Sequence, residues 1–332
     1  MYSIFVGIDI AKTSFEACIL IDGKPRDLGQ FSNEDQGFSD LLLVIDDHTD
    51  YGRDSWFVCF ENTGAYSKPL LSWLHEKNIP CREENAMRIY RSLGLNRGKD
   101  DKSDARNICM YAYRLRDAIQ PTQVSSPIIQ KIKKLLSRRS FLVKKRTACQ
   151  TSIKALSIEL DPSLLALFSE QHKQLMDTYE QQIKVIEDLI ENSLKEDDQI
   201  NKNYQLAQSV KGIGPITSAY MIAFTHNFEH FETARQFACY TGIAPFPNRS
   251  GTSIRGKSRV SPLANKHIKG VLSNGAATAI IHDAELKIYY QRKRAEGKAY
   301  GTVINAVKNK LVQRVFAVID RQSPYIPLAT YA

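Results

Sequence analysis

Short apolar segments alternate with polar turns over the first third of the chain. Residues 2–8 and 15–21 are β-rich apolar runs, and Asp22-Gly23 after the second run predicts a hairpin turn. Residues 56–60 form a continuous apolar run, which is typical of a strand buried on both faces. A third strand is expected at residues 25–31, helices at 38–45 and 66–77, and a short strand at 79–83. This order predicts a mixed α/β sheet domain that ends near residue 120.

From Pro127 onward the apolar positions recur at helical spacings. One stripe has steps of four, three and seven residues and contains Ile128, Ile132, Leu135, Leu142, Cys149, Ile153 and Leu156. After a break at residues 161–163, a second stripe contains Leu175, Tyr179, Ile183, Ile186 and Ile190. The two stripes predict a helical hairpin or coiled coil, a segment suited to dimerisation.

The last third of the chain is predicted to be a mostly α-helical unit, entered through a polar linker at residues 195–203. Here Gly212 and Gly214 lie between two helical patterns, as in a helix–hairpin–helix motif, whose glycines let a backbone turn approach a phosphate. Other tight helix–helix turns use two glycines as well. Residues 241–258 are too rich in Gly, Pro and Ser for regular structure, and a final helix is expected at 302–320. The predicted domains are residues 1–125, 126–200 and 201–332.

Composition narrows the class of partner. The formal net charge of the 332-residue chain is +9, which favours a polyanionic partner. The six cysteines form no CxxC pair, so that we expect a reduced chain without a zinc site or a disulfide framework. Neither a signal peptide nor an apolar stretch of membrane-spanning length is found, and a soluble, cytoplasmic protein is expected.

The basic residues gather in two parts of the chain that contain no acid. Between residues 131 and 146 these are Lys131, Lys133, Lys134, Arg138, Arg139, Lys144, Lys145 and Arg146. Between residues 233 and 282 they include Arg235, Arg249, Arg255, Lys257, Arg259, Lys266 and Lys269. A solvated basic face is the simpler interpretation, but so many like charges repel one another unless an anion lies among them. The pattern therefore favours nucleic-acid binding.

Four carboxylates stand at the ends of predicted elements. Asp9 ends the first strand, Glu61 follows the apolar strand, and Asp101 and Asp104 begin a helix, three residues apart on one face. Each has a simpler interpretation, as a lone strand-end residue or as a helix cap whose negative charge interacts favourably with the positive end of the helix dipole. Asp100 and Asp104, four residues apart, are the competing helical pair.

Four acids brought close together repel one another unless cations neutralise them. Mg²⁺ prefers carboxylate and phosphate oxygens, and two such ions about 4 Å apart can hold the attacking and leaving oxygens of a phosphodiester in line. The order Asp, Glu, Asp, Asp is that of nucleases and integrases with a ribonuclease-H-like sheet. Sugar kinases and actin-like ATPases also open with an apolar-Gly-Ile-Asp segment, but they need a second phosphate-binding glycine hairpin, which the sequence lacks.

The sequence resembles insertion-sequence recombinases whose N-terminal domain is similar to the RuvC Holliday-junction resolvase and whose C-terminal domain contains a serine. This family includes a pilin-gene invertase. The resemblance covers nearly the whole chain and rests on blocks that begin at Gly7, Glu61, Lys99, Gly212, Thr241 and Ser250. Asp100 stands where the family usually has Thr. Ser261-Pro262-Leu263-Ala264 stands where many members have Ser-Lys-x-Gly.

The resemblance implies a transposase that cuts and rejoins DNA. The tetrad Asp9, Glu61, Asp101 and Asp104 would bind Mg²⁺, and Ser250 would form a covalent 5′-phosphoserine link. Arg249 and Arg255 are candidates for steadying the phosphate. A structured noncoding bridge RNA would pair with target and donor DNA, and the protein would act as a dimer or tetramer. Ser253, Ser258 and Ser261 are rival nucleophiles, because serines in loops are common turn residues.

Two other functions fit the same residues. One is a RuvC-like nuclease or junction resolvase that uses water as the nucleophile. The other is an RNA-binding scaffold with a degenerate site, an interpretation against which the complete tetrad argues.

Overall fold

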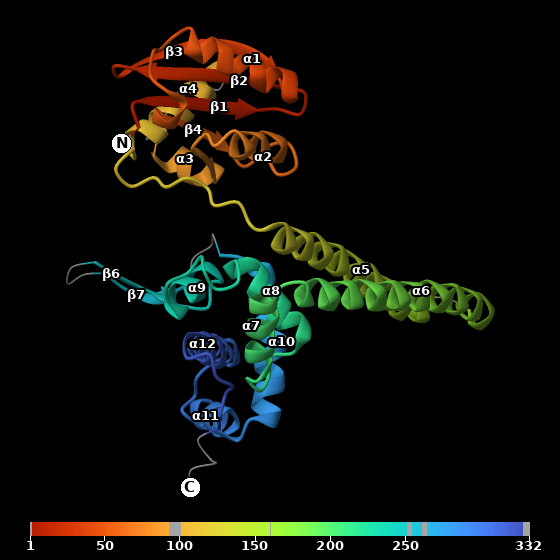
Figure 1. Ribbon diagram of the computed structural model, residues 1–332. Coiled ribbons are helices and arrows are strands. Elements are labelled where there is room, and N and C mark those ends of the chain that lie inside the picture. Colours follow the sequence, from red (N-terminus) through yellow and green to blue (C-terminus); the bar gives the residue numbers. More distant parts are fainter. Residues whose placement is uncertain (1, 93–100, 160, 251–253, 261–263, 328–332) are drawn as a thin grey trace. The chain divides into compact units, whose positions relative to one another are not determined.

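The computed structural model describes residues 2–92, 101–159, 161–250, 254–260 and 264–327. Two compact units make up the chain, residues 1–124 and residues 125–332 (Figure 1). A further division of the second unit near residue 200 stays a prediction. No described helix is both long enough and apolar enough to cross a membrane.

The first unit is built on a five-stranded sheet with the order β3-β2-β1-β4-β5. Its strands are β1 (Ile4–Ile10), β2 (Ser14–Ile21), β3 (Lys24–Ser32), β4 (Trp56–Glu61) and β5 (Cys81–Glu84). β1, β2 and β3 pair antiparallel, whereas β4 runs parallel to both β1 and β5. The predicted hairpin turn is confirmed, since Asp22 and Gly23 have φ angles of 51° and 75°, as a two-residue hairpin turn requires. The mixed α/β sheet domain is likewise confirmed.

Helices cover both faces of this sheet. Val6 and Ile8 of β1 pack with α1 (Asp35–Asp46) and α2 (Lys68–Glu76) on one face. Phe5 packs on the other face with α4 (Asp101–Arg114) and with α3 (Ala86–Ser92). A short 3-10 turn at Arg53–Ser55 precedes β4. The central strands β1 and β4 are therefore buried on both sides, as their continuous apolar runs predict.

The backbone of α4 touches β1 at Gly7. A Cβ atom at this position would lie 2.2 Å from the Cys109 amide nitrogen and 2.3 Å from the Ala105 carbonyl oxygen. The Cys109 thiol in turn donates a hydrogen bond to the carbonyl oxygen of Phe5, at 3.2 Å. Only glycine allows so close an approach of helix and strand.

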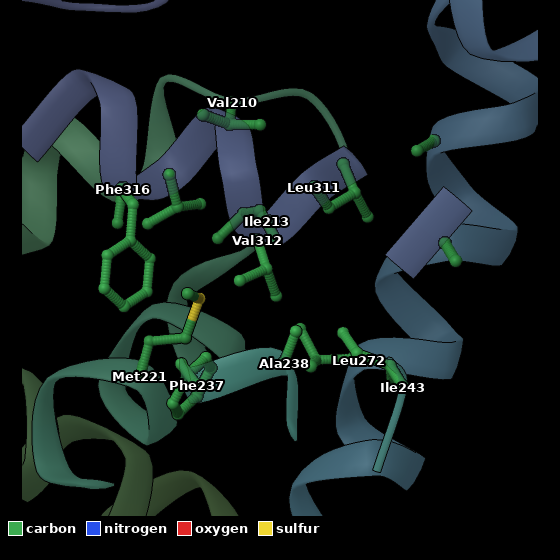
Figure 2. Packing of buried hydrophobic residues seen from close by; sticks show 14 of the residues in the cluster. Val210, Ile213, Met221, Phe237, Ala238, Ile243, Leu272, Leu311, Val312 and Phe316 are labelled. Carbon is green, nitrogen blue, oxygen red and sulfur yellow. The ribbon is translucent and has the colours of Figure 1, made fainter. Parts of the chain in front are cut away.

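The second unit is mostly helical. Its helices are α5 (Pro127–Glu159), α6 (Pro162–Lys195), α7 (Asp198–Gln208), α8 (Pro215–Thr225), α9 (Ala234–Tyr240), α10 (Lys266–His282), α11 (Ala284–Ala295) and α12 (Tyr300–Asp320). β6 (Phe246–Ser250) and β7 (Ile254–Arg259) form an antiparallel hairpin. α8 is buried on nearly all sides, as expected for a helix that is apolar all round. Figure 2 shows part of the core around it, where Met221 of α8 lies near Phe237 of α9.

The long helices α5 and α6 lie side by side (Figure 1). Ile132 and Leu142 of the first predicted stripe are buried, and so are Ile183 and Ile190 of the second. Two ion pairs join the two helices, Arg139–Glu187 and Arg146–Glu180, and a third joins Lys131 to Glu196 at the C-cap of α6. The two predicted helices are thus observed, while their coiled-coil packing stays a prediction.

Two expectations for the second unit are wrong. The polar segment 195–203 is not a linker, because α7 begins at Asp198. The Asp197 carboxylate caps this helix by accepting a hydrogen bond from the Ile200 amide at 2.8 Å, and Ile200 and Tyr204 are buried. Residues 241–258 also contain regular structure, the β6–β7 hairpin. Pro247 is tolerated there because the strand register shifts between Phe246 and Asn248.

The contact at Gly7 yields a prediction about stability. Gly7→Ala is expected to lower the free energy of unfolding of the first unit by about 1–3 kcal/mol, because the new methyl group overlaps the backbone of α4. Both tryptophans, Trp56 and Trp73, lie in this unit, so that urea unfolding followed by tryptophan fluorescence reports on it specifically. Gly52→Ala is the control, since its Cβ would meet only the exposed Asp54 side chain. Equal urea midpoints for the two variants would contradict the prediction.

Candidate functional site

Asp9 and Glu61 lie at the carboxyl ends of neighbouring parallel strands. The register of β1 with β4 runs from Ile4↔Trp56 to Ile8↔Phe60, so that Asp9 and Glu61 are the next residues on each strand. Side chains alternate along a strand, and Asp9 therefore shares a face with Gly7, as Glu61 does with Cys59. This is the face that α4 covers. Both acids are half-buried.

The contacts of α4 fix its direction across β1. Tyr113 stacks edge-on against Phe5 with ring centroids 5.5 Å apart, whereas Ala105, two turns earlier in α4, touches Gly7. The helix therefore runs antiparallel to β1, and its first turn points toward the carboxyl end of the strand. Asp101 precedes Ala105 by about 6 Å along the helix axis. Asp9 follows Gly7 by about 7 Å along the strand. The first residue of α4 and Asp9 thus lie at about the same distance from the Gly7 contact, measured along β1 toward its carboxyl end.

Asp101 and Asp104 continue the buried stripe of α4. Asp101 is four residues before Ala105 and Asp104 is four residues before Ile108, and both Ala105 and Ile108 are buried against the sheet. Residues four apart share a helix face, so both positions face the sheet end. Asp104 is half-buried, and Asp101 is the first residue of the helix, although its side chain lies outside the described part. Asp100 lies outside the described residues.

The donor set suits a hard divalent cation. Asp9 of β1, Glu61 of β4 and Asp104 of α4 carry carboxylate oxygens, the type of ligand that Mg²⁺ prefers. Among the side chains that the structure describes, no three acids, histidines or cysteines come together closely enough to hold a metal. Asp9, Glu61 and Asp104 do not form such a group by themselves. Asp101, whose side chain lies outside the described part, would have to complete the set, and a metal site at this strand end stays a prediction.

A fifth carboxylate on the same sheet face was missed by the sequence analysis. Glu84 of β5 pairs in register with Glu61, and it is only 4% exposed. It accepts hydrogen bonds from the Tyr111 hydroxyl of α4 at 3.0 Å and from Arg82 at 3.2 Å. Burial alone would raise the pKa of Glu84, but the hydrogen bond from the Asn85 amide and the charge of Arg82 lower it overall. Glu84 is thus an ionised acid with its own cation, and it ties α4 to the sheet edge.

Ser250 is the last residue of β6. Its backbone pairs with Ile254, and the preceding pair in the register is Arg249 with Arg255. Lys257, Ser258 and Arg259 lie in β7, while Ser253 and Ser261 fall outside the described residues. The side chains of β6 from Pro247 on and those of β7 are not described. The structure therefore places Ser250 beside two arginines in the register of one hairpin, in the second unit.

The eight basic residues predicted on the first long helix divide into two groups. Lys131, Arg139 and Arg146 form the ion pairs with α6 and its C-cap, and the Lys133 ammonium donates to the His226 imidazole at 2.9 Å. Burial, and next the charge of Lys133, lower the pKa of His226 to about 4, so that the neutral ring can accept this hydrogen bond. The other four are exposed: Lys134, Arg138, Lys144 and Lys145. These four are the better placed to meet a polyanion.

The glycine turn between α7 and α8 makes a close approach inside the protein. Gly212 has a φ of 95°, and a Cβ there would lie 2.6 Å from the Gly275 carbonyl oxygen of α10. Helix packing therefore accounts for this glycine without a phosphate. Gly214 has open space around its Cα and is the N-cap of α8. In α10, Lys266 is exposed and Lys269 is half-buried.

Comparison with known proteins accords with this arrangement. A DEDD transposase domain of the IS110 type, described as Transposase, matches residues 6–158. A domain described as Transposase IS116/IS110/IS902 family matches residues 204–291. The first of these covers the four acids, and the second covers the hairpin with Ser250.

Similar proteins of full length are also known. The chain is 26% identical over 329 residues to the pilin gene-inverting proteins of Moraxella lacunata and Moraxella bovis, which covers 98% of each chain. It is 29% identical over 111 residues to an uncharacterized protein of insertion element IS110 from Streptomyces coelicolor, covering 33% of this chain and 27% of that one. The chain thus contains an N-terminal DEDD transposase domain and a C-terminal IS116/IS110/IS902 family transposase domain, matched in order along its length, and it is an enzyme of the DNA recombinase and transposase class.

Proposed function

We propose that this transposase cuts and rejoins DNA strands with the acidic tetrad of its first unit and with Ser250 of its second unit. The observation that carries the proposal is the direction of α4, which brings its first turn to the carboxyl ends of β1 and β4. Asp9, Glu61, Asp101 and Asp104 would hold Mg²⁺ at that point. A divalent ion bound there would stabilise the charge that develops on the phosphate and polarise the leaving oxygen.

In this proposal the Ser250 hydroxyl is the nucleophile. Its oxygen forms a bond to a DNA phosphorus while the bond from phosphorus to the 3′-oxygen breaks, which leaves a 3′-hydroxyl end and a 5′-phosphoserine. Attack by a different 3′-hydroxyl then restores a phosphodiester and releases the serine. The energy of the original bond is kept in the intermediate, so that no other energy source is needed. Arg249 and Arg255 stay the sequence's candidates for stabilising the charged phosphate, since the register shows only that their backbones pair one position before Ser250.

We also propose that a noncoding bridge RNA guides the protein to its DNA. This proposal is supported by the resemblance to the recombinase family and by the exposed basic residues of α5. Lys134 and Lys144 are among these, and Arg138 and Lys145 flank the Phe141 ring at 5.1 and 5.5 Å. The turn at Gly214 is a further candidate for phosphate contact, as in a helix–hairpin–helix motif. Sequencing of RNA that co-purifies with the protein should recover one discrete species encoded beside its gene, and random fragments would argue against guidance.

We further propose that α5 and α6 form a coiled coil through which two protomers associate. On α6 a second apolar stripe lies one residue away from the buried one and contains Leu164, Leu175, Val185 and Leu189. These side chains are 44%, 49%, 57% and 43% exposed. Val185 and Leu189 are four residues apart, and Leu175 and Leu189 are separated by two heptads, as in a second coiled-coil seam. Exposed apolar stripes of this kind mark protein interfaces.

Ser250→Ala tests the serine. We expect strand exchange to fall by at least about 10³-fold, because no other group takes over the covalent step. Strand exchange passes through a protein–DNA adduct in this proposal, so the yield of that adduct is measured on a denaturing gel. The substrate is nicked DNA that cannot be religated. Ser258→Ala is the control and should retain the adduct. An adduct of normal yield with Ser250→Ala would contradict the assignment.

The acids are tested in the same assay. The double variant Asp101→Asn and Glu61→Gln should also lower cleavage by at least about 10³-fold, because two of the proposed metal ligands lose their negative charge. DNA binding should remain measurable. Cleavage by the wild-type protein without any adduct would instead favour a nuclease that uses water.

Self-association is tested by placing charge on the exposed stripe. Leu175→Glu together with Leu189→Glu should convert a dimer or larger assembly into a monomer, because two carboxylates would be buried without partners. Light scattering after size-exclusion chromatography gives the mass. Lys184→Glu, at an exposed position on another face of α6, is the control and should keep the wild-type mass. An unchanged mass for the double variant would place the interface elsewhere.

A further inference from the structure

A cavity of about 520 Å³ lies between α10 and the beginning of α12 in the second unit. Lys269 and Ser273 of α10 line one side, and residues 299–302, Ile304, Asn305 and Lys308 line the other. None of the described residues around it is acidic. The cavity is separate from both the acidic tetrad and the β6–β7 hairpin, since no residue of either lines it.

Lys308 is a buried cation, and no carboxylate of the described residues forms an ion pair with it. It is 4% exposed, and its ammonium donates a hydrogen bond to the Asn305 side-chain oxygen at 3.2 Å. Burial, followed by the positive charge of Lys269, lowers the pKa of Lys308 to about 8. Burying an ammonium beside a second one is costly unless an anion joins them.

The nearby acids have other partners. Helix α10 contains no acid, and α12 has none before Asp320. Asp283, the N-cap of α11, and Glu285 within it both accept hydrogen bonds from Arg314, and Glu296 at the C-cap pairs with Lys293. These acids are thus paired with other cations, and the side-chain partner of Lys308 is the neutral amide of Asn305.

The start of α12 adds a second feature that favours an anion. This 21-residue helix has Ala299 as its N-cap, a residue whose side chain cannot accept a hydrogen bond from the first-turn amides. The positive end of the helix dipole therefore opens into the same cavity as the two lysines. At the rim, Tyr300 is 56% exposed, a flat surface on which a base can stack.

We propose that this cavity binds a phosphate group of the nucleic-acid backbone, with Lys308 and Lys269 as its cationic ligands and the first turn of α12 as a donor. The inference rests on the proposed function only in taking nucleic acid as the source of the phosphate. The site would be a second anchor for the strand, remote in sequence from the serine that reacts with it. Phosphate contacts of this kind position a strand without reading its sequence.

The test compares Lys308→Met with the wild-type protein. We expect affinity for fluorescently labelled 30-mers to fall about tenfold. The slope of log affinity against log salt should become less steep, by about 0.9 for duplex DNA and about 0.7 for a single strand. Separate arms with duplex DNA, single-stranded DNA and RNA show which source supplies the phosphate. The thermal midpoint of the free protein should stay the same or rise, because an uncompensated buried charge has been removed.

Lys310→Met is the control. It lies on the same helix, but its ammonium is 4.8 Å from the Tyr289 ring centroid and does not line the cavity. Inorganic phosphate alone is a further probe and should raise the thermal midpoint of the wild type and of Lys310→Met, but not of Lys308→Met. If Lys308→Met does not fold, Lys269→Met replaces it in both measurements.

Two outcomes would overturn the inference. One is an affinity and salt slope equal to those of Lys310→Met. The other is a lower thermal midpoint with an unchanged salt slope, which would mark Lys308 as a purely structural residue. A wild-type protein that binds no nucleic acid but is stabilised by inorganic phosphate through Lys308 would instead contradict the proposed function and support the cavity.

Discussion

The backbone of α4 rests on β1 at Gly7, and the candidate metal site depends on this contact. With any side chain at that position the helix would have to move outward from the sheet, and Asp101 and Asp104 would move with it. The Glu84–Tyr111 hydrogen bond holds the same helix from the neighbouring edge of the sheet. A metal site made of these short carboxylates, as we propose, would tolerate little displacement of the helix.

The second unit manages charge in two different ways. Along α5 and α6, cations and acids of opposite helices neutralise each other, which leaves a smaller set of exposed basic residues. Between α10 and α12 the opposite occurs, since two lysines line a cavity to which the described part of the chain contributes no acid. The first arrangement stabilises the protein by itself, whereas the second costs stability until an anion arrives. The lysines of the cavity, which pair with no described acid, therefore indicate a ligand site more directly than the paired cations of α5 do.

Sequence patterns predicted the sheet well because its signals are local. The apolar run 56–60 and the Asp22-Gly23 turn each depend on neighbouring residues alone. The partners of the α5 cations could not be predicted, because the acids of α6 and its C-cap are between 34 and 65 residues away along the chain. Segment 195–203 was misassigned since its polar composition hides Ile200 and Tyr204, whose burial depends on other helices. Lys308 did carry a signal, because it stands in the apolar stripe of Ile304, Leu311 and Val315.

The contact between Gly212 and Gly275 has a consequence for how the second unit can vary. Each glycine occupies the space that a side chain on the other would need: a Cβ at Gly212 would lie 2.6 Å from the Gly275 carbonyl, and one at Gly275 would lie 2.7 Å from the Gly212 carbonyl. A larger residue at one position cannot be compensated by a smaller one at the other, because both residues are already glycine and have no side chain. The two positions form one steric constraint, and relatives that keep this close approach of the turn to α10 should keep glycine at both positions.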